Sequence, residues 1–412
     1  MPPPTATTRP RTSREDRTAQ ILQVAALLML ERGLKGMTQA DVAERAGMKA
    51  TNLTHYFRKK EDIAFACLSR TMDHIEARID QAEGEPDAPA RVSTFIRLAI
   101  EHEKGVREKR VPALAPLSDL RAMSEPGQGL LVARFMTLFK RVKGFFPAVE
   151  GTTGRALRTA RTHVLIEVLL WLPAWILRYS AADYDRVHHR IVEILTHGLS
   201  AGPPWAPLQV EAGEVGIEEG AARRGFLMAA TRLINQRGYH GASVDLIVSE
   251  ARVTKGSFYH HLEAKDDLVT ACFLDSLATI SRAQHQTDGM AGTHLEKLQS
   301  AVATLLELQL SDGDQLLRTS ALQGMPTDML RSALDRSNRA AGRFADMVID
   351  AMSEGSVRAV DPVVASQMLM AAINGAYELR GWAGKLGREL AVEIYASTLF
   401  DGLFAEVTPP GR

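Results

Sequence analysis

Apolar residues recur at helical spacing along nearly the whole chain. In the segment AQILQVAALLMLERG (19–33), five of them fall on one face of a helix, namely Ile21, Val24, Ala25, Leu28 and Met29. Gly33 and then Gly36 are expected to end this helix. No segment alternates apolar and polar residues between turn signals, as a half-buried strand would. The pattern therefore predicts an all-α protein.

Shorter elements follow this first helix. Thr38 is a natural N-cap for a short helix over 39–46, and Gly47 makes a turn into a second short helix over 50–57. A long helix is expected over 59–79, with Glu61 and Asp62 in its first turn. Two short helices joined by a tight turn and packed on a longer one make a helix-turn-helix. This arrangement alone is weak evidence for DNA binding, because helical bundles also use such hairpins for packing.

The same plan occurs twice in the chain. A shift of 205 positions aligns 21–68 with 226–273 without a gap, and 12 of these 48 positions are identical. A second match, between 191–202 and 395–406 at an offset of 204, lies near the end of each half. Two copies of one complete unit explain both matches, so the sequence indicates a duplication. The segment between the copies is rich in Pro, Gly and Glu and has the composition of a linker.

The repeat predicts two units, each with a helix-turn-helix three-helix domain followed by a larger helical domain. The expected segments are a disordered basic arm (1–13), a first helix-turn-helix domain (14–60), a first helical regulatory domain (61–200), a linker (201–219), a second helix-turn-helix domain (220–265) and a second helical regulatory domain (266–406).

Composition narrows the function classes. The chain has 412 residues, 45% hydrophobic and 24% charged, and a formal net charge of zero. No apolar run reaches the ~20 residues of a spanning helix, and the N-terminus lacks the apolar centre of a signal peptide, so we expect a cytoplasmic protein with no membrane partner. The two cysteines, Cys67 and Cys272, suggest buried thiols. No catalytic motif or metal-ligand spacing is found, so no enzyme, metal or cofactor is expected.

The two helix-turn-helix segments differ in charge. Residues 9–60 hold eleven cations and five anions, a net of +6, whereas 217–268 hold seven of each sign. If both segments bind phosphate, the first supplies most of the long-range attraction.

The segments GMKATNLTHYFRKKEDI (47–63) and RVTKGSFYHHLEAKDDL (252–268) resemble the signature of tetracycline-repressor (TetR) family regulators. The resemblance covers about fifty residues in each half. It implies a transcriptional regulator that binds double-stranded operator DNA through the helix-turn-helix. Repression is favoured over activation. The resemblance also implies an unknown small-molecule effector, bound in a helical domain, that releases the DNA. The alternative is a helical interaction or architectural protein in which one or both motifs no longer bind DNA.

The resemblance places DNA contacts at the start of each recognition helix and at the helix N-termini beside it. In the first unit these residues are Thr38, Lys49, Thr51, Asn52, His55, Tyr56 and Lys60, and in the second they are Ser243, Thr254, Lys255, Gly256, Ser257, Tyr259, His260 and Lys265. Both copies depart from the signature: the first has Ala50, Thr51 and Thr54, and the second has Arg252, His261 and Leu262. The two heads should therefore read unlike half-sites in an asymmetric operator, unless one head no longer binds.

Family members dimerise through their last two helices, for which the segments here are 155–179 with 184–199, and 361–383 with 387–404. The halves could pair within one chain as a pseudo-dimer, or between chains as a homodimer. Residues that could line an effector pocket are Phe135, Phe139, His163, Trp171 and Trp175 in the first half, and Gln323, Asn374, Tyr377 and Trp382 in the second. For each of them, plain core or bundle packing is the stronger interpretation.

Overall fold

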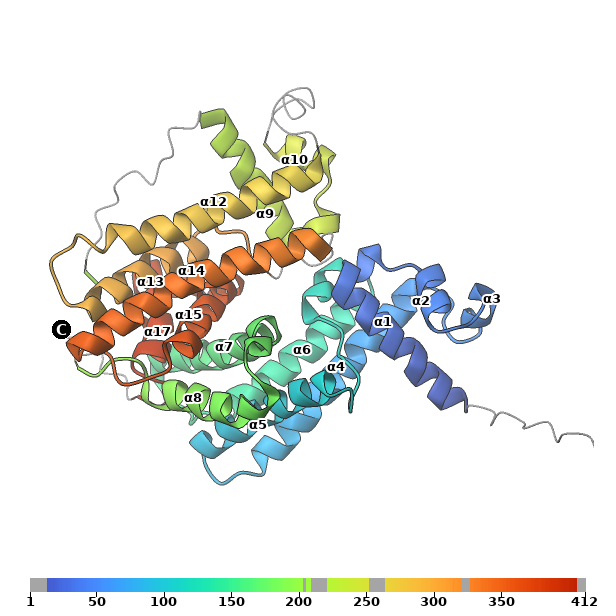
Figure 1. Cartoon of the computed structure of the whole chain (residues 1–412), viewed down its shortest axis with the longest axis horizontal. Coiled ribbons are helices and arrows are strands. Elements are labelled where there is room, and N and C mark those ends of the chain that lie inside the picture. Colours follow the sequence, from blue (N-terminus) through green and yellow to red (C-terminus); the bar gives the residue numbers. More distant parts are fainter. Residues whose placement is uncertain are drawn as a thin grey trace, which may run out of the picture.

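The computed structural model describes residues 13–202, 205–208, 221–251, 264–313, 315–319 and 327–405. Within these residues the only extended pairing is a single bridge between Ser200 and Val357, and no β-strand is formed. The predicted all-α fold is confirmed (Figure 1). The helices of the first half are α1 (Arg14–Gly36), α2 (Gln39–Arg45), α3 (Ala50–Leu53), α4 (Lys60–Glu83), α5 (Ala88–Arg107), η1 (Leu117–Ala122), α6 (Gly127–Lys143), α7 (Gly151–Trp175), η2 (Ile176–Arg178), η3 (Ala181–Asp183) and α8 (Tyr184–His197).

The second half repeats this order. Its described helices are α9 (Ala221–Gly241), α10 (Val244–Glu250), α12 (Lys265–Gln286), α13 (His294–Leu310), α14 (Thr327–Glu354), α15 (Pro362–Ala376), η5 (Tyr377–Leu379), α16 (Arg380–Leu386) and α17 (Arg388–Phe400). Helices α2 and α10 begin and end 205 residues apart, as do the starts of α4 and α12. The structure thus carries the duplication through the helix order of both halves.

Local boundaries differ slightly from the sequence expectation. Helix α1 begins at Arg14, and Ser13 caps it by accepting a hydrogen bond from the Asp16 amide. Gly33 adopts a φ of 65° inside α1, yet the element continues to Gly36. The prediction of a helix over 50–57 was wrong in length, because α3 ends at Leu53 and a turn follows. The long helix was predicted correctly, and it extends four residues further, to Glu83.

Equivalent buried contacts hold the two helix-turn-helix domains onto their long helices. The Cys67 thiol donates to the Leu22 carbonyl (3.5 Å), and the Cys272 thiol donates to the Leu227 carbonyl (3.6 Å). Both cysteines are free and buried, and burial raises the pKa of each thiol to about 12. They are packing residues, as the sequence suggested.

The last helices of the two halves pack together in the centre of the molecule (Figure 1). Helix α7 lies against α15 and α17, and α8 lies against α15. Trp171 donates its indole N–H to Gln367 Oε1 (3.0 Å), His163 Nδ1 lies 3.0 Å from the Tyr395 hydroxyl, and Arg190 pairs with Asp361. The four segments predicted from the sequence as dimerisation helices are therefore brought together within one chain.

A reciprocal pair of hydrogen bonds crosses this junction. The Leu199 amide donates to the Leu399 carbonyl (3.0 Å), and the Leu403 amide donates to the Leu195 carbonyl (2.6 Å). Positions 195 and 399, and likewise 199 and 403, are 204 residues apart, which is the offset of the C-terminal repeat. In a two-fold interface, when one residue of the first unit contacts a second residue of the other unit, the equivalent residues make the same contact in the opposite direction. The bundle therefore has local two-fold pseudo-symmetry.

One helical stretch, Gly151–Arg178, is long and apolar enough to cross a membrane by length and composition. In the folded chain 56% of its apolar window is buried, and α7 forms part of the central bundle. A helix buried on several sides passes the same test as a membrane span, so this stretch is explained by its place in the core.

The part of the predicted linker that the structure describes lies on the second half. Trp205 packs against Phe400 with ring centroids 5.2 Å apart, the Ala206 amide donates to Gln299 Oε1 (3.0 Å), and the Leu208 amide donates to Ser300 Oγ (2.8 Å). Residues 203–204 and 209–220 lie outside the described residues. The segment 205–208 is thus a docked strap, although its composition predicted only a linker.

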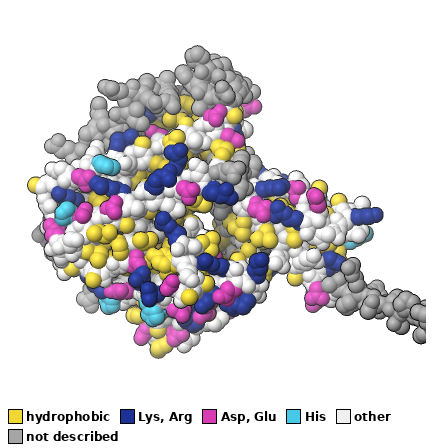
Figure 2. Space-filling view, viewed as in Figure 1, with side chains coloured by type: hydrophobic (Ala, Val, Ile, Leu, Met, Phe, Trp, Pro, Cys, Tyr) yellow, Lys and Arg dark blue, Asp and Glu magenta, His cyan; other side chains and the backbone are white. Residues whose placement is uncertain are grey.

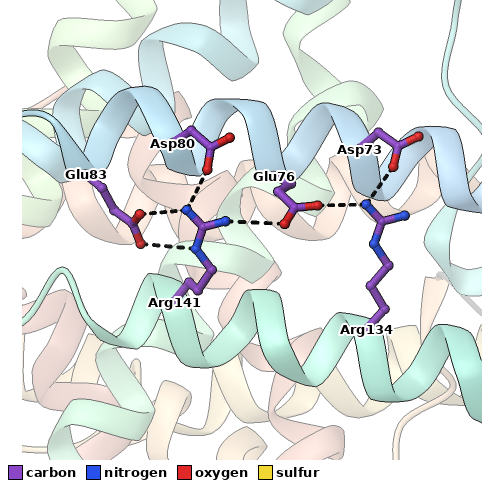
Figure 3. A network of polar contacts seen from close by, with 6 residues as sticks. All are labelled: Asp73, Glu76, Asp80, Glu83, Arg134 and Arg141. Carbon is purple, nitrogen blue, oxygen red and sulfur yellow. Dashed lines mark hydrogen bonds and ion pairs between the residues drawn. The ribbon is translucent and has the colours of Figure 1, made fainter.

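Ion pairs fasten α4 to α6 along the first half (Figure 3). Arg141 pairs with Glu76, Asp80 and Glu83, and Arg134 pairs with Asp73 and Glu76. The positions 205 residues after Asp73, Glu76 and Asp80 hold Ala278, Ser281 and His285. In the second half Arg343 of α14 pairs with Asp288, beyond the end of α12. Among the described residues, two arginines of α6 thus hold four carboxylates of α4.

Candidate nucleic-acid interface and ligand pocket

The first helix-turn-helix domain projects from the body, and basic side chains are visible over it (Figures 1 and 2). Thr38 is exposed and caps α2: its hydroxyl accepts from the Asp41 amide (3.1 Å) and donates to Asp41 Oδ2 (2.7 Å). The same hydroxyl is the main cause that lowers the pKa of the Asp41 carboxyl. The N-terminus of α2 is thus held in a fixed geometry, with the Thr38 side chain at the surface.

The turn and recognition helix present most of the predicted contact residues to solvent. Gly47 turns the chain with a φ of 65°, a conformation that glycine adopts without strain. The side chains of Lys49, Thr51, Asn52 and His55 are exposed, while Leu53 is buried. Tyr56 is half-buried and packs on the core. Burial of Leu53 fixes the helix on the domain and leaves its polar side free to face a ligand.

The two lysines at the start of the long helices have different surroundings. Lys60 Nζ donates to the Lys35 carbonyl at the end of α1 (3.4 Å). Lys265 Nζ lies 4.6 Å from the centroid of the Tyr239 ring and is half-buried. Burial, with a smaller contribution from the positive charge of Lys35, lowers the pKa of Lys265. The second lysine is therefore partly engaged in packing its own domain.

In the second head, Ser243 caps α10 by accepting from the Leu246 amide (3.3 Å), as predicted. The other predicted contacts of this head fall outside the described residues, namely Thr254, Lys255, Gly256, Ser257, Tyr259 and His260.

A pocket opens in the second half between α12, α14, α15 and the segment 315–319. It is narrow: the cavity volume is about 10 Å³, close to the minimum that holds one water molecule. The lining residues carry no charge and are Phe273, Ser276, Leu277, Ile280, Leu316, Leu317, Thr319, Ser337, Met370, Ile373 and Asn374. Asn374 is one of the residues predicted from the sequence to contact an effector. Gln323, another of them, lies outside the described residues.

The remaining predicted pocket residues have other surroundings. In the first half, His163, Trp171 and Trp175 belong to the central bundle, and Phe135 and Phe139 on α6 are half-buried. In the second half, Tyr377 is buried beside Arg318 and Arg380, and the half-buried Trp382 packs on the core. Most of these positions fit the packing interpretation that the sequence favoured.

Sequence reasoning missed a set of charges, partly buried, where the two halves meet. Glu378 on η5 pairs with Arg318 of the second half and with Arg121 of η1 in the first. Burial, reinforced by the charge of Glu378, raises the pKa of Glu167 on α7 to about 7, and burial lowers the pKa of His163 to about 4. The sequence signal was a single carboxylate, Glu167, inside the apolar run VLIEVLLWL.

Metal binding has no support in the described part of the chain, where no group of three or more His, Cys, Asp or Glu side chains could hold an ion. The geometry defines a class: a helical protein made of two repeated units, the first of which begins with a helix-turn-helix. The sequence profile of "Bacterial regulatory proteins, tetR family" matches residues 21–67 and 226–272. Both halves of the chain therefore carry the N-terminal domain of the TetR family, in tandem.

Curated relatives agree with this assignment. The chain is similar to the Transposon Tn10 TetC protein of Escherichia coli (42% identity over 52 residues, 13% of this chain and 26% of the relative). It is also similar to the HTH-type transcriptional repressor KstR2 of Mycolicibacterium smegmatis (32% over 87 residues, 20% and 42%) and to the repressor DhaR of Mycobacterium sp. strain GP1 (26% over 157 residues, 37% and 79%). The first two alignments span about a quarter and two-fifths of those relatives.

Among solved structures, the chain is similar to a TetR-family transcriptional regulator from Bordetella parapertussis (21% identity, 44% of this chain and 94% of that one, TM-score 0.37). It is also similar to AibR in complex with isovaleryl coenzyme A and operator DNA (18% identity, 43% and 97%, TM-score 0.36). Similarity at these scores supports no argument about function.

Proposed function

We propose that the chain is a cytoplasmic DNA-binding transcriptional regulator, acting as a repressor, with two unlike DNA-binding heads. The observation that carries the proposal is the exposed polar side of the first recognition helix, where Lys49, Thr51, Asn52 and His55 face solvent. Asn side chains read adenine in the major groove, and Lys and Thr contact phosphates. Two of the relatives are named as HTH-type transcriptional repressors, which supports repression rather than activation.

The two halves act as an intramolecular pseudo-dimer under this proposal. The reciprocal bonds Leu199–Leu399 and Leu403–Leu195 support it, because they reproduce within one chain the contacts of a two-fold interface. Since the heads differ in sequence and charge, the operator would consist of two unlike half-sites.

The effector is an uncharged, mainly apolar molecule bound in the second-half pocket. Seven of the residues that line this pocket are apolar, and the polar ones are Ser276, Thr319, Ser337 and Asn374. A carboxylate or phosphate placed there would meet no cation among the lining residues, and burying an unpaired charge is costly. Hydroxyl and amide groups suit a hydroxyl or carbonyl on the effector.

A gel-shift titration with the DNA upstream of the chain's own gene, at several salt concentrations, tests the DNA-binding proposal. We expect sequence-specific binding that weakens steeply with salt, because phosphate contacts release counterions. Asn52→Ala should relax specificity at one base position, whereas Lys49→Ala should weaken binding to all sequences similarly.

Failure to bind any DNA, specific or not, would favour the alternative of a helical interaction protein. Binding in which changes in the second head have no effect would identify the first head as the only reader.

A further inference from the structure

The segment 315–319 of the second half has two sides with different contacts. Leu316, Leu317 and Thr319 line the pocket, whereas the Arg318 side chain is 3% exposed and contacts residues outside it. The Leu317 amide also donates to the Ser276 hydroxyl of α12 (2.8 Å). A change in the pocket wall must therefore displace Arg318, because neighbouring residues in one short segment move together.

Arg318 and Leu316 are bonded directly to the second DNA-binding head. Asn235 on α9 donates from Nδ2 to the Leu316 carbonyl (2.9 Å), and its Oδ1 accepts from the Arg318 amide (3.0 Å). Arg318 Nη2 donates in turn to the Asn235 carbonyl (2.7 Å). Asn235 is fully buried. Three hydrogen bonds thus join the pocket wall to the first helix of this head, with no intervening residue.

The Arg318 side chain is also held at the bundle. Its guanidinium pairs with Glu378 on η5 and lies 4.2 Å from the centroid of the Tyr377 ring. Glu378 also pairs with Arg121 of η1, and Asp119 of η1 accepts from the Leu34 amide in α1 (2.9 Å). Glu378 therefore connects the two halves, and Arg318 connects α9 to Glu378.

The first half lacks the Asn235 bonds of this link, and its α1 is held to η1 through the Leu34 amide and Asp119 instead. The residue that aligns with Asn235 at the repeat offset is Leu30, whose side chain cannot form these hydrogen bonds and is 40% exposed. Helix α4 of the first half is instead fastened to α6 by Arg134 and Arg141. The same position of the repeat is buried and bonded in one half and open to solvent in the other.

We propose that Arg318 is the positioning residue that transmits occupancy of the second-half pocket to the second head, while the first head keeps its place. The inference rests on the proposed effector pocket. An effector larger than the empty pocket pushes 316–319 outward, and the bonds to Asn235 carry the shift to α9. The effector can alter DNA binding only as far as it binds the shifted state more tightly.

Hydrogen exchange of the full chain tests this without a known effector. Ser337 lines the pocket from α14, so Ser337→Phe fills it and imitates occupancy. We expect this change to increase amide exchange in α9 by about tenfold, within the usual range of coupling between sites, and to leave α1 unchanged. An Arg318→Lys background keeps the charge but loses the Nη2 bond to Asn235, while the two backbone bonds to Asn235 remain. In this background the response of α9 exchange to Ser337→Phe should fall by at least about half.

Arg121→Gln is the matched control, because it removes an ion pair to the same Glu378 and leaves the bonds between Arg318 and Asn235 intact. It should preserve the response of α9 to Ser337→Phe. If Ser337→Phe does not fold, Nile red, a neutral apolar dye, replaces it as the pocket probe.

An equal response of α9 in the parent and in the Arg318→Lys background, or no response of α9 to either the substitution or the dye, would overturn the proposal. These measurements need no DNA. A chain that binds no operator but shows the Arg318-dependent response would therefore refute the proposed function and retain the coupling.

Discussion

Identical residues at equivalent positions of the two units have acquired different physical roles. Lys60 and Lys265 begin the two long helices, but Lys60 bonds a backbone carbonyl at the surface and Lys265 lies over the Tyr239 ring. An ammonium over an aromatic face contributes to packing as well as to charge. The repeat alignment alone could not reveal this difference, because it depends on Tyr239, which replaces Leu34 of the first unit.

The two lysine-to-alanine variants should therefore have different effects. We expect Lys60→Ala to weaken DNA binding and to reduce the slope of log affinity against log salt by about 1, as the loss of one phosphate contact does. Lys265→Ala should destabilise the second head by about 1 kcal/mol through the lost cation–π contact. Gel shifts over a salt series and thermal unfolding measure the two effects. An unchanged salt slope in Lys60→Ala would contradict the first expectation.

Glu167 gives a stability effect with a defined pH window. Its carboxyl has a pKa of about 7 in the folded chain against an ordinary 4.5, because it is buried and lies near Glu378. A raised pKa favours folding fully below about pH 4.5, and this contribution is lost as the pH rises through 7. The loss is roughly 3 kcal/mol at most, for a shift of this size.

Glu167→Gln should therefore be more stable than the parent chain at pH 8, and the difference should shrink toward pH 5. Unfolding midpoints of the two chains across this range measure it. His163 Nε2 lies 3.6 Å from Glu167 Oε1, but burial lowers the pKa of His163 to about 4, so this histidine stays neutral across the range. A constant difference across the range would show that ionisation of Glu167 is not the cause.

At the scale of helices, the ion pairs of Figure 3 fasten α4 to α6 in the first half. Surface ion pairs contribute little singly, but Arg141 contacts three carboxylates and is itself only 26% exposed. We expect Arg141→Gln to lower the unfolding free energy by about 1 kcal/mol at low salt and by less at high salt. Arg343→Gln, which removes one pair in the second half, should cost less than about 0.5 kcal/mol. Equal losses would contradict a network effect.

Most helices could be predicted from the sequence because their signals are local. Caps at Thr38 and Ser243, a turn at Gly47 and apolar spacing in α1 each depend on nearby residues. The pocket and the charge cluster could not be predicted. They join positions far apart in the chain, such as Asn235 with Arg318 and Arg121 with Glu378, and no spacing rule indicates such pairs. The prediction that Trp171 and His163 contact an effector rests on residue type alone. In the structure both side chains bond across the bundle.

At the scale of the whole molecule, duplication kept the bundle symmetric and let the heads diverge. The reciprocal bonds of the bundle join equivalent residues, yet Asn235 has no polar counterpart in the first head. Fusion of two units in one chain permits this. In a homodimer of identical chains any change in one head appears in both, whereas here each head can change alone. A single chain can therefore combine a basic first head with a second head that is bonded to the wall of the second-half pocket.

Two glycines at the crossing of the halves provide a test of the pseudo-symmetry. Gly198 and Gly402 have φ values of 72° and 93°, and a Cβ at either would lie within 2.6 Å of a backbone atom of the opposite half. Gly355 also has a positive φ, of 85°, but a Cβ there would meet nothing within 4 Å. Gly198→Ala and Gly402→Ala should each cost more than about 2 kcal/mol, and Gly355→Ala only about 1 kcal/mol, the strain of the conformation alone.

Thermal unfolding at several protein concentrations measures these costs and the mode of pairing together. Under the proposed pairing within one chain, the midpoints of the parent chain and of the variants should not depend on concentration. Light scattering should give the mass of a single chain, 45.1 kDa. A midpoint that rises with concentration, together with twice this mass, would show that the bundle forms between chains. Similar losses for Gly198→Ala and Gly355→Ala would show instead that the close crossing contributes little to the fold.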